Sequence, residues 1–389
     1  MERRYFFPID IVRIPCSQCV CDMTGLPDPE TRFEQRSNWK DPDWWRSALL
    51  AYTIALIGGS IASQAGFPLP WMLGPFFACG VASGAGLTLS ALPFGRETAQ
   101  LIIGLGIGLR FTAATLISTL LLAPAMLVST AYVIGYTMVA AFLFRPLARV
   151  NHSTAFFATA AGGVADMALI ARERGGDASA VGIVHALRVS MTVAIVPILV
   201  VSFGDSGNAP DRLAATGPSV LWLLPAFCLA VLLAKLLKKT RMPNPWLVAP
   251  MLLGIVLGST GLLLTAVPPV AIVGAQVLLG TWLGSQFRKE LLLTLPRVAL
   301  AGIAASLFMI CAAFAGAVLL SATTSLSLAT AFLALAPAAV TEMVITAKTM
   351  HLDPEIITGF HVMRIFIVCS SSLLVFRLYR YIGRLLARA

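Results

Sequence analysis

Ionisable side chains recur in register in two strongly apolar stretches of the chain, residues 154–188 and 330–364. A constant offset of 176 residues relates the stretches, since 330 − 154 = 176 and 364 − 188 = 176. The offset pairs an acid, a histidine and an arginine with their counterparts: Asp166 with Glu342, His185 with His361, and Arg188 with Arg364. Ionisable groups cost free energy in apolar surroundings, so these residues are the first candidates for a functional site.

Each histidine stands three residues before its arginine, a spacing that places both side chains on one face of a helix. The arginine could bind an anionic group, while the carboxylate or the histidine takes up a proton. A buried acid–arginine pair that only locks the structure is equally compatible with the pattern, so both interpretations stay open. We predict that the substrate-binding residues are Asp166, His185, Arg188, Glu342, His361, Arg364, Gly162, Gly163 and Thr341.

The acid in each stretch follows a point where a helix should break. The residues before it include Gly162 and Gly163 in the first stretch and Pro337 in the second. Glycine weakens a helix, and proline removes one of its hydrogen-bond donors. The next helices are expected to begin at Asp177 and Asp353, and we interpret both residues as N-caps rather than as substrate ligands.

The composition is that of a membrane protein. Of the 389 residues, 58% are hydrophobic and only 12% are charged, and the mean hydropathy is +0.85. A soluble domain has roughly 25% charged residues. The chain is therefore predicted to be an all-α polytopic membrane protein. We expect apolar segments at about 47–64, 71–91, 97–115, 118–144, 153–171, 178–203, 219–238, 246–265, 268–286, 293–320, 327–349 and 355–377.

The net charge of +10 does not predict a nucleic-acid partner, because no DNA-binding motif or concentrated basic patch is present. Basic residues on the cytoplasmic side of a membrane protein explain the charge instead. The 4 histidines form no H-x-x-x-H pair, and Cys16, Cys19 and Cys21 form one C-x-x-C-x-C cluster without a second ligand group. We therefore expect no cofactor, no metal and no enzymatic activity.

Two further blocks repeat along the chain. PLPWMLGP at 68–75 matches PNPWLVAP at 243–250, and AQLIIGLGIGLRF at 99–111 matches AQVLLGTWLGSQF at 275–287. Ordered matches of this kind indicate an internal duplication, and the glycine spacing in the second pair predicts close helix packing. We predict four parts, namely a polar flexible extension (1–45), membrane repeat 1 (46–204), a linker (205–217) and membrane repeat 2 (218–389).

Basic residues also predict how the repeats are oriented, because they gather on the cytoplasmic side. Arginines before the first apolar run and at the end of the chain put both termini in the cytoplasm. The basic clusters at 235–241 and 288–289 are also cytoplasmic only if one segment in each half enters the membrane and returns. The segment with the acid is the best candidate, since broken backbone is tolerated there when protein or water satisfies it. The prediction is two inverted-topology repeats, each with about five crossings plus a broken or re-entrant helix.

The blocks PWMLGP and PWLVAP, AQ-x-x-x-G-x-x-x-G, G-G-x-x-D-M, A-A-x-x-E-M and H-x-x-R together resemble the AbrB-type family of duplicated bacterial membrane proteins, over about residues 47–380. Members of that family are labelled as transcriptional regulators or as ammonia monooxygenases. The family is similar to cation–proton antiporters and anion transporters, which use inverted repeats with broken helices. The resemblance implies a place in the bacterial inner (cytoplasmic) membrane.

These observations favour a secondary-transporter-like protein that moves a small anionic or zwitterionic solute, with coupling to protons as an option. A membrane regulator that influences gene expression indirectly, through a solute it senses, is the first alternative. An ammonia monooxygenase-type membrane enzyme is the second. The expected partners are a small-molecule solute and the lipid bilayer, and association into a homo-oligomer is left open.

Overall fold

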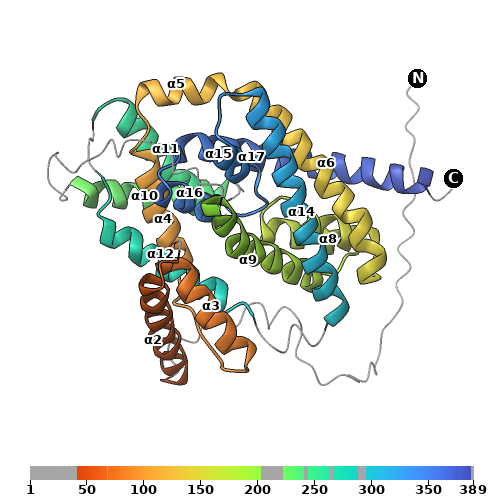
Figure 1. Ribbon diagram of the computed structural model, residues 1–389, viewed down its shortest axis with the longest axis horizontal. Helices are drawn as coiled ribbons and strands as arrows, with labels where there is room; N and C mark the ends of the chain where they lie inside the picture. Colours follow the sequence, from red (N-terminus) through yellow and green to blue (C-terminus); the bar gives the residue numbers. More distant parts are fainter. Residues whose placement is uncertain are drawn as a thin grey trace, which may run out of the picture. The chain divides into compact units, whose positions relative to one another are not determined.

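The computed structural model describes residues 42–67, 69–202, 222–240, 244–262, 266–287 and 295–386. The regular structure in this part of the chain is α-helical (Figure 1). The helices are α2 (Pro42–Gln64), α3 (Pro70–Gly84), α4 (Gly95–Gly108), α5 (Ala113–Leu121), α6 (Ala123–Ala148), α7 (His152–Thr159), α8 (Val164–Glu173), α9 (Ala178–Ser202), α10 (Leu223–Lys239), α11 (Pro245–Ser259), α12 (Pro269–Gly284), α14 (Pro296–Thr323), α15 (Leu328–Leu335), α16 (Val340–Thr349) and α17 (Pro354–Leu386).

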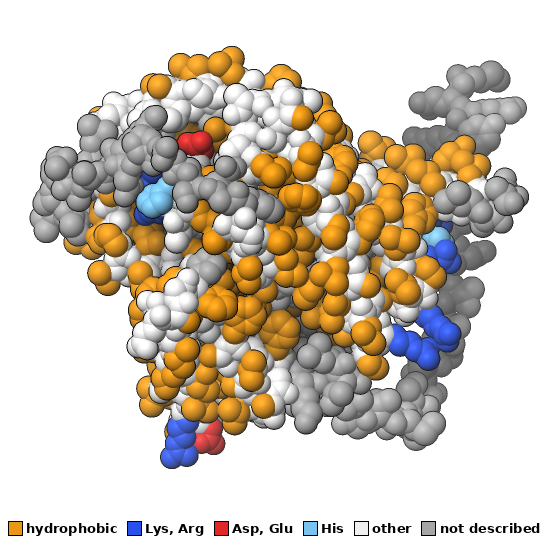
Figure 2. Space-filling model, in the orientation of Figure 1, with side chains coloured by type: hydrophobic (Ala, Val, Ile, Leu, Met, Phe, Trp, Pro, Cys, Tyr) orange, Lys and Arg blue, Asp and Glu red, His pale blue; other side chains and the backbone are white. Residues whose placement is uncertain are grey.

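Five of the described helices are long and apolar enough to cross a membrane: α2, α6, α9, α14 and α17. The pair α4 and α5 makes a sixth span if the two count as one. Large apolar side chains point outward, for example Leu49 (73% exposed), Val128 (72%) and Leu319 (63%). Hydrophobic side chains cover most of the face drawn in Figure 2, and few charged ones interrupt them. Because exposed apolar surface of this kind needs lipid around it, the chain is a multi-span integral membrane protein.

Helices from the N-terminal half of the chain pack on helices from the C-terminal half. α3 lies along α12, and α4 lies along α11. A Cβ atom added to Gly104 on α4 would lie 2.6 Å from the backbone oxygen of Leu247 on α11. One added to Gly284 on α12 would lie 2.7 Å from the backbone oxygen of Phe76 on α3. The repeated glycines therefore allow the close packing that their spacing predicted, and that packing joins the two halves.

The longer helices also pack across the two halves of the chain. α6 lies against α14, while α9 packs on α14 and α17 packs on α6. The hydroxyl of Tyr132 on α6 donates a hydrogen bond to the backbone oxygen of Ala312 on α14, at 2.8 Å. The short helices α7, α8, α15 and α16 pack among these long ones, and almost every residue of α15 and α16 is buried. The long helices thus enclose α15 and α16, whereas α8 is partly exposed, for example at Leu169 (59% exposed).

The structure differs from the expected segments in two places. The segments predicted at 97–115 and 118–144 are divided differently, because the chain bends by 96° between α4 and α5 and α6 begins only at residue 123. Thr112 caps α5 by accepting a hydrogen bond from the amide of Thr115 at 3.2 Å, a local signal that hydropathy does not contain. α2 begins four residues before the predicted boundary at 46, since 46 − 42 = 4. The rest of the predicted extension and the linker 205–217 lie outside the described residues.

Candidate functional site

Two helices break at matched positions inside the protein. The breaks span residues 160–163, between α7 and α8, and 336–339, between α15 and α16. They contain Gly162-Gly163 and Pro337, as the sequence predicted. The last carbonyl groups of α7 and α15 have no partner within their own helix, because a helix end lacks the next turn. Donors from elsewhere in the chain must therefore satisfy them.

The first broken helix turns back on itself. At the start of α7, Asn151 Nδ2 donates to the backbone oxygen of Gly175 at 2.6 Å, and Ser153 Oγ donates to that of Arg174 at 2.9 Å. Both acceptors directly follow α8, so the two ends of the α7–α8 unit meet. We call this the open end of the α7–α8 hairpin, opposite the break. α7 and α8 therefore form a helical hairpin.

Arg188 and His185 of α9 donate hydrogen bonds to the free carbonyl groups at the break in the first half. Arg188 Nη1 donates to the backbone oxygens of Ala160 at 2.7 Å and Thr159 at 3.3 Å. Its Nη2 donates to His185 Nδ1 at 3.1 Å, and His185 Nε2 donates to the backbone oxygen of Phe157 at 2.9 Å. A neutral imidazole with its proton on Nε2 satisfies both of these bonds.

The same arrangement recurs in the second half. Arg364 Nη1 donates to the backbone oxygen of Ala336 at 2.8 Å, and Nη2 donates to that of Ala338 at 2.9 Å. Nη2 also lies 2.7 Å from His361 Nδ1, and His361 Nε2 donates to the backbone oxygen of Leu333 at 2.8 Å. Residues 333 and 336 stand 176 positions after the acceptors of the first half, since 333 − 157 = 176 and 336 − 160 = 176. The matched sequence therefore encodes matched hydrogen bonds.

The two arginines act as caps for the ends of broken helices, where a positive charge is favourable. Arg188 and Arg364 are each 4% exposed, and neither Nε atom has a hydrogen-bond partner. The ion pairs among the described residues include those of Arg46 with Asp43 and of Arg110 with Glu355, and neither involves these two arginines. Arg188 and Arg364 lie near enough to interact electrostatically. Two buried cations thus come together with some of their hydrogen-bonding capacity unused.

Glu342 and Thr341 follow the second break, in the first turn of α16. They are 3% and 1% exposed, and neither Glu342 Oε2 nor Thr341 Oγ1 has a hydrogen-bond partner. Arg96 of α4 acts electrostatically on Glu342, and its guanidinium lies 4.5 Å from the ring centroid of Trp282 on α12. A buried polar atom without a partner costs about 1–3 kcal/mol. Asp166 occupies the matched position in α8, but its side chain lies outside the described residues.

The structure brings part of the predicted set together and adds two residues to it. Tyr136 lies near both guanidinium groups, and its hydroxyl donates to the backbone oxygen of Leu335 at 3.1 Å. Neither Tyr136 nor Arg96 was predicted, because the positions offset by 176 hold Ala312 and Ile272, and a search for repeated residues passes over unmatched ones. The two histidines prove to be partners of the arginines.

The remaining predicted residues have structural surroundings of their own. Gly162 lies in the first break, where an added Cβ would come within 2.7 Å of Met167 Cε. Gly163 precedes α8 in an extended conformation. Asp177 caps α9 as predicted, because its Oδ1 accepts hydrogen bonds from the amides of Ser179 at 2.8 Å and Ala180 at 3.1 Å. Asp353 stands directly before α17.

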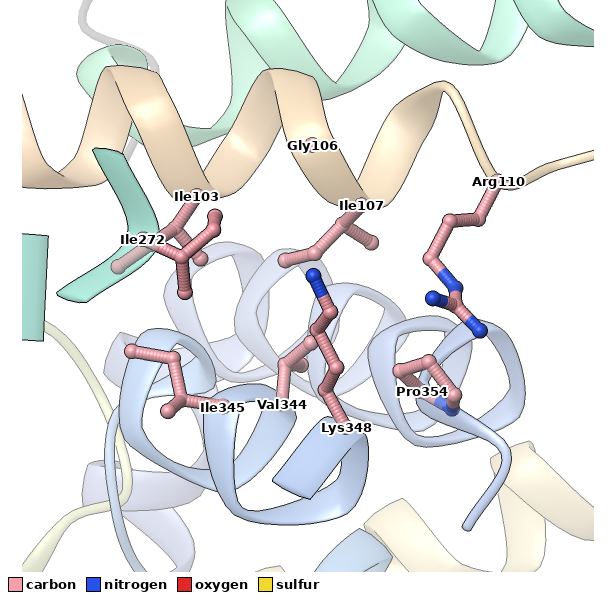
Figure 3. Close-up of a pocket in the computed structure, with 9 residues that line it drawn as sticks. All are labelled: Ile103, Gly106, Ile107, Arg110, Ile272, Val344, Ile345, Lys348 and Pro354. Carbon is pink, nitrogen blue, oxygen red and sulfur yellow. The ribbon is translucent and has the colours of Figure 1, made fainter. Parts of the chain in front are cut away.

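A pocket lies between α4 and the pair α16 and α17 (Figure 3). It is lined by Ile103, Gly106, Ile107, Arg110, Ile272, Val344, Ile345, Lys348 and Pro354. The amino group of Lys348 points toward α4, and Arg110 reaches toward Pro354. Arg110 Nε donates to Glu355 Oε1 at 3.2 Å. One wall of this mainly apolar pocket is α16, the helix that also carries Thr341 and Glu342.

Fold and site together define a multi-span helical membrane protein with matched broken helices. The family model described as "Transition state regulatory protein AbrB" matches residues 23–143 and 71–380. The chain therefore belongs to the AbrB family, as the sequence blocks indicated. Two matches to one model fit an internal duplication.

Two relatives resemble the chain over most of its length. It is 26% identical over 369 residues to a *Bacillus subtilis* (strain 168) protein named "Uncharacterized protein YhjN", a match that covers 85% of this chain and 92% of the relative. It is 27% identical over 312 residues to an *Escherichia coli* (strain K12) protein named "Putative regulator AbrB", with 78% and 88% covered. The likeness thus extends across both halves of the chain.

Proposed function

We propose that the chain is a secondary-transporter-like protein that moves a small anionic or zwitterionic solute across the bacterial inner membrane. The observation that carries the proposal is the pair of buried arginines at two matched helix breaks. Each arginine uses its Nη atoms on backbone oxygens and on a histidine ring nitrogen, and keeps an Nε atom without a partner. A buried cation favours an anionic group, and secondary transporters bind their solutes at broken helices between repeats.

Inverted topology of the two halves is part of this proposal, and charge supports it. The open end of the α7–α8 hairpin is flanked in sequence by Arg145, Arg149 and Arg174, whereas the positions offset by 176 hold Ser321, Ser325 and Met350. By the positive-inside rule, the more basic end faces the cytoplasm, and its less basic counterpart, which carries Lys348 in the last turn of α16, faces the other side. His152 at this open end lies beside Tyr379 near the end of α17. This contact supports a cytoplasmic C-terminus as part of the same proposal.

Glu342 adds a group of opposite sign. Its buried Oε2 atom has no partner, so it can accept a hydrogen bond from an amino group of a zwitterion or carry a proton. Thr341 offers a neutral hydroxyl next to it. The pocket of Figure 3 supplies apolar walls on the same helix, and its Val344 and Ile345 stand three and four positions after Thr341, on one helix face. This set favours a solute with an anionic group, with proton coupling through Glu342 as an added proposal.

The first experiment measures thermal unfolding of the purified full-length protein with a panel of carboxylates, amino acids and inorganic phosphate. A ligand that binds the folded state raises its stability by RT ln(1 + [L]/Kd), about 2.7 kcal/mol at 100 times Kd. Any compound that stabilises the protein is then tested for flux into proteoliposomes. We expect stabilisation to be lost in Arg364→Lys, which keeps the charge but not the planar fork, and in Glu342→Gln.

Arg46→Gln is the matched control, because Arg46 is an exposed arginine paired with Asp43 at the start of α2. It should keep both the stabilisation and the flux. If Arg364→Lys, Glu342→Gln and Arg46→Gln all respond to the compound as the unaltered protein does, the solute does not bind at the helix breaks. The variants' own unfolding curves show whether each one is folded.

A solute-sensing membrane regulator is the second candidate function. The observation that favours it is the name of the *E. coli* relative, "Putative regulator AbrB". A regulator of this kind binds its solute without moving it. Stabilisation by a compound that gives no flux in proteoliposomes, with the same loss in Glu342→Gln, would support the sensor over the transporter. We propose no catalytic role for these residues.

A further inference from the structure

A second cluster of polar side chains lies at the open end of the α7–α8 hairpin, away from the breaks. It consists of Arg145 on α6, His152 on α7, and Tyr379 and Arg380 on α17. The ring centroids of His152 and Tyr379 are 5.7 Å apart. Both arginines act electrostatically on His152, and Arg145 acts on Tyr379 as well. We call these four residues the α6–α7–α17 cluster.

Two buried polar atoms in this cluster lack partners. Tyr379 is 0% exposed, and neither its hydroxyl nor His152 Nδ1 has a hydrogen-bond partner. The tyrosine ring packs against Phe142, with centroids 4.4 Å apart, and against Phe156 at 5.4 Å. That packing explains the ring but not the hydroxyl, because phenylalanine would fill the same space. The Tyr379 hydroxyl is a donor, and His152 Nδ1 is one when that nitrogen carries the ring proton. A buried polar atom without a partner is costly, so two of them in one place point to a missing partner.

The positive charges of the α6–α7–α17 cluster also lack an acidic partner among the described residues. Arg145 and Arg380 are exposed, and neither takes part in the ion pairs found between described residues. The positive-inside rule accounts for two arginines at a cytoplasmic helix end. It does not account for the donors buried beneath them. The positions that match Arg145 and His152 in the other half are Ser321 and Leu328, so the cluster exists at one end of the molecule only.

We propose that the α6–α7–α17 cluster binds a phosphate group. The two guanidinium groups would hold its charge, while Tyr379 and His152 donate to its oxygens from below. Exposed apolar side chains on the same two helices favour a lipid as the carrier of that group: Leu143 and Leu147 on α6, and Leu374 and Leu378 on α17, are between 40% and 70% exposed. A lipid whose headgroup is bound by the α6–α7–α17 cluster would have its acyl chains along these residues.

The experiment uses the full-length protein in detergent and measures thermal unfolding and lipid adducts by native mass spectrometry. The probes are phosphatidylglycerol, phosphatidylcholine and inorganic phosphate. We expect phosphatidylglycerol to stabilise the protein and phosphatidylcholine to have little effect. Tyr379→Phe, which keeps the ring, and Arg145→Ser, which copies Ser321 of the other half, should each weaken the binding of phosphatidylglycerol about tenfold.

Arg377→Gln is the control, because Arg377 is an exposed arginine on the same helix. It should bind the lipid as the unaltered protein does. Stabilisation by inorganic phosphate alone, lost in Tyr379→Phe and kept in Arg377→Gln, supports the site but assigns it to a free anion. Equal stabilisation by phosphatidylcholine, or equal losses in Arg377→Gln and Tyr379→Phe, would overturn the proposal. Because Tyr379→Phe removes only an unpartnered hydroxyl, that variant should fold without lipid as well as the parent does.

Discussion

Gly284→Ala tests the close contact on which the joining of the two halves depends. An added Cβ on Gly284 would lie 2.7 Å from the backbone oxygen of Phe76 and 2.7 Å from Cys79 Cβ, both on α3. Neither neighbour is the end of a flexible side chain, so the helices must separate. Overpacking of this kind costs about 1–3 kcal/mol, and alanine's better helix propensity returns at most about 1 kcal/mol of it. We expect Gly284→Ala to lower the free energy of unfolding.

Gly135→Ala is the matched control for this prediction. Gly135 lies inside α6, and an added Cβ there would meet nothing within 4 Å. Without a clash, the same substitution should stabilise the helix by about 1 kcal/mol. The assay is thermal unfolding of both variants in the same detergent, read as the shift from the unaltered protein. If Gly284→Ala gains stability as Gly135→Ala does, then α3 and α12 do not approach each other as closely as the structure indicates.

Three further predictions concern single interactions. Asp177→Ala should lower the free energy of unfolding by about 1 kcal/mol through loss of the α9 cap, and Asp177→Asn should restore most of it; equal stability of all three proteins would contradict the cap. Tyr132→Phe should cost about 1 kcal/mol by removing the bond to α14, and no loss in thermal unfolding would mean that this contact is not made. Burial, and then Arg145 and Arg380, lower the pKa of His152, which lies outside the spanning helices. The unfolded state then binds more protons, so stability should fall as pH drops below about 6.5, and His152→Leu should flatten that dependence in unfolding curves recorded across the range.

The sequence predicted the features that a duplication repeats. The membrane class follows from the composition, whereas the family, the breaks at Gly162-Gly163 and Pro337 and the close packing at the paired glycines follow from patterns that occur twice. The cap at Asp177 was predictable from the local sequence, because a short carboxylate at a helix start reaches the free amides of the first turn. The site-residue set stays a prediction.

What the sequence did not predict depends on contacts between distant segments. The bend between α4 and α5 and the places of Arg96 and Tyr136 belong to this kind. Arg96 reaches Trp282 and acts on Glu342, which stand 186 and 246 residues further along the chain, since 282 − 96 = 186 and 342 − 96 = 246. Neither hydropathy nor the repeat contains that proximity, because it arises only when helices of the two halves cross.

The sequence left two interpretations of the arginines open, a locking pair with the acid or a ligand for an anionic group. The structure indicates a lock of a different composition, in which Arg364 joins backbone oxygens of the break and His361. Backbone carbonyl groups, rather than a carboxylate, accept the hydrogen bonds of Arg364, so the guanidinium group is held in place but its positive charge is not neutralised. Glu342 keeps an oxygen without a partner. A lock made with Glu342 would have cancelled both charges and left nothing for a solute. Holding the break with backbone oxygens therefore leaves the charge of the same arginine available to the anionic solute that we propose.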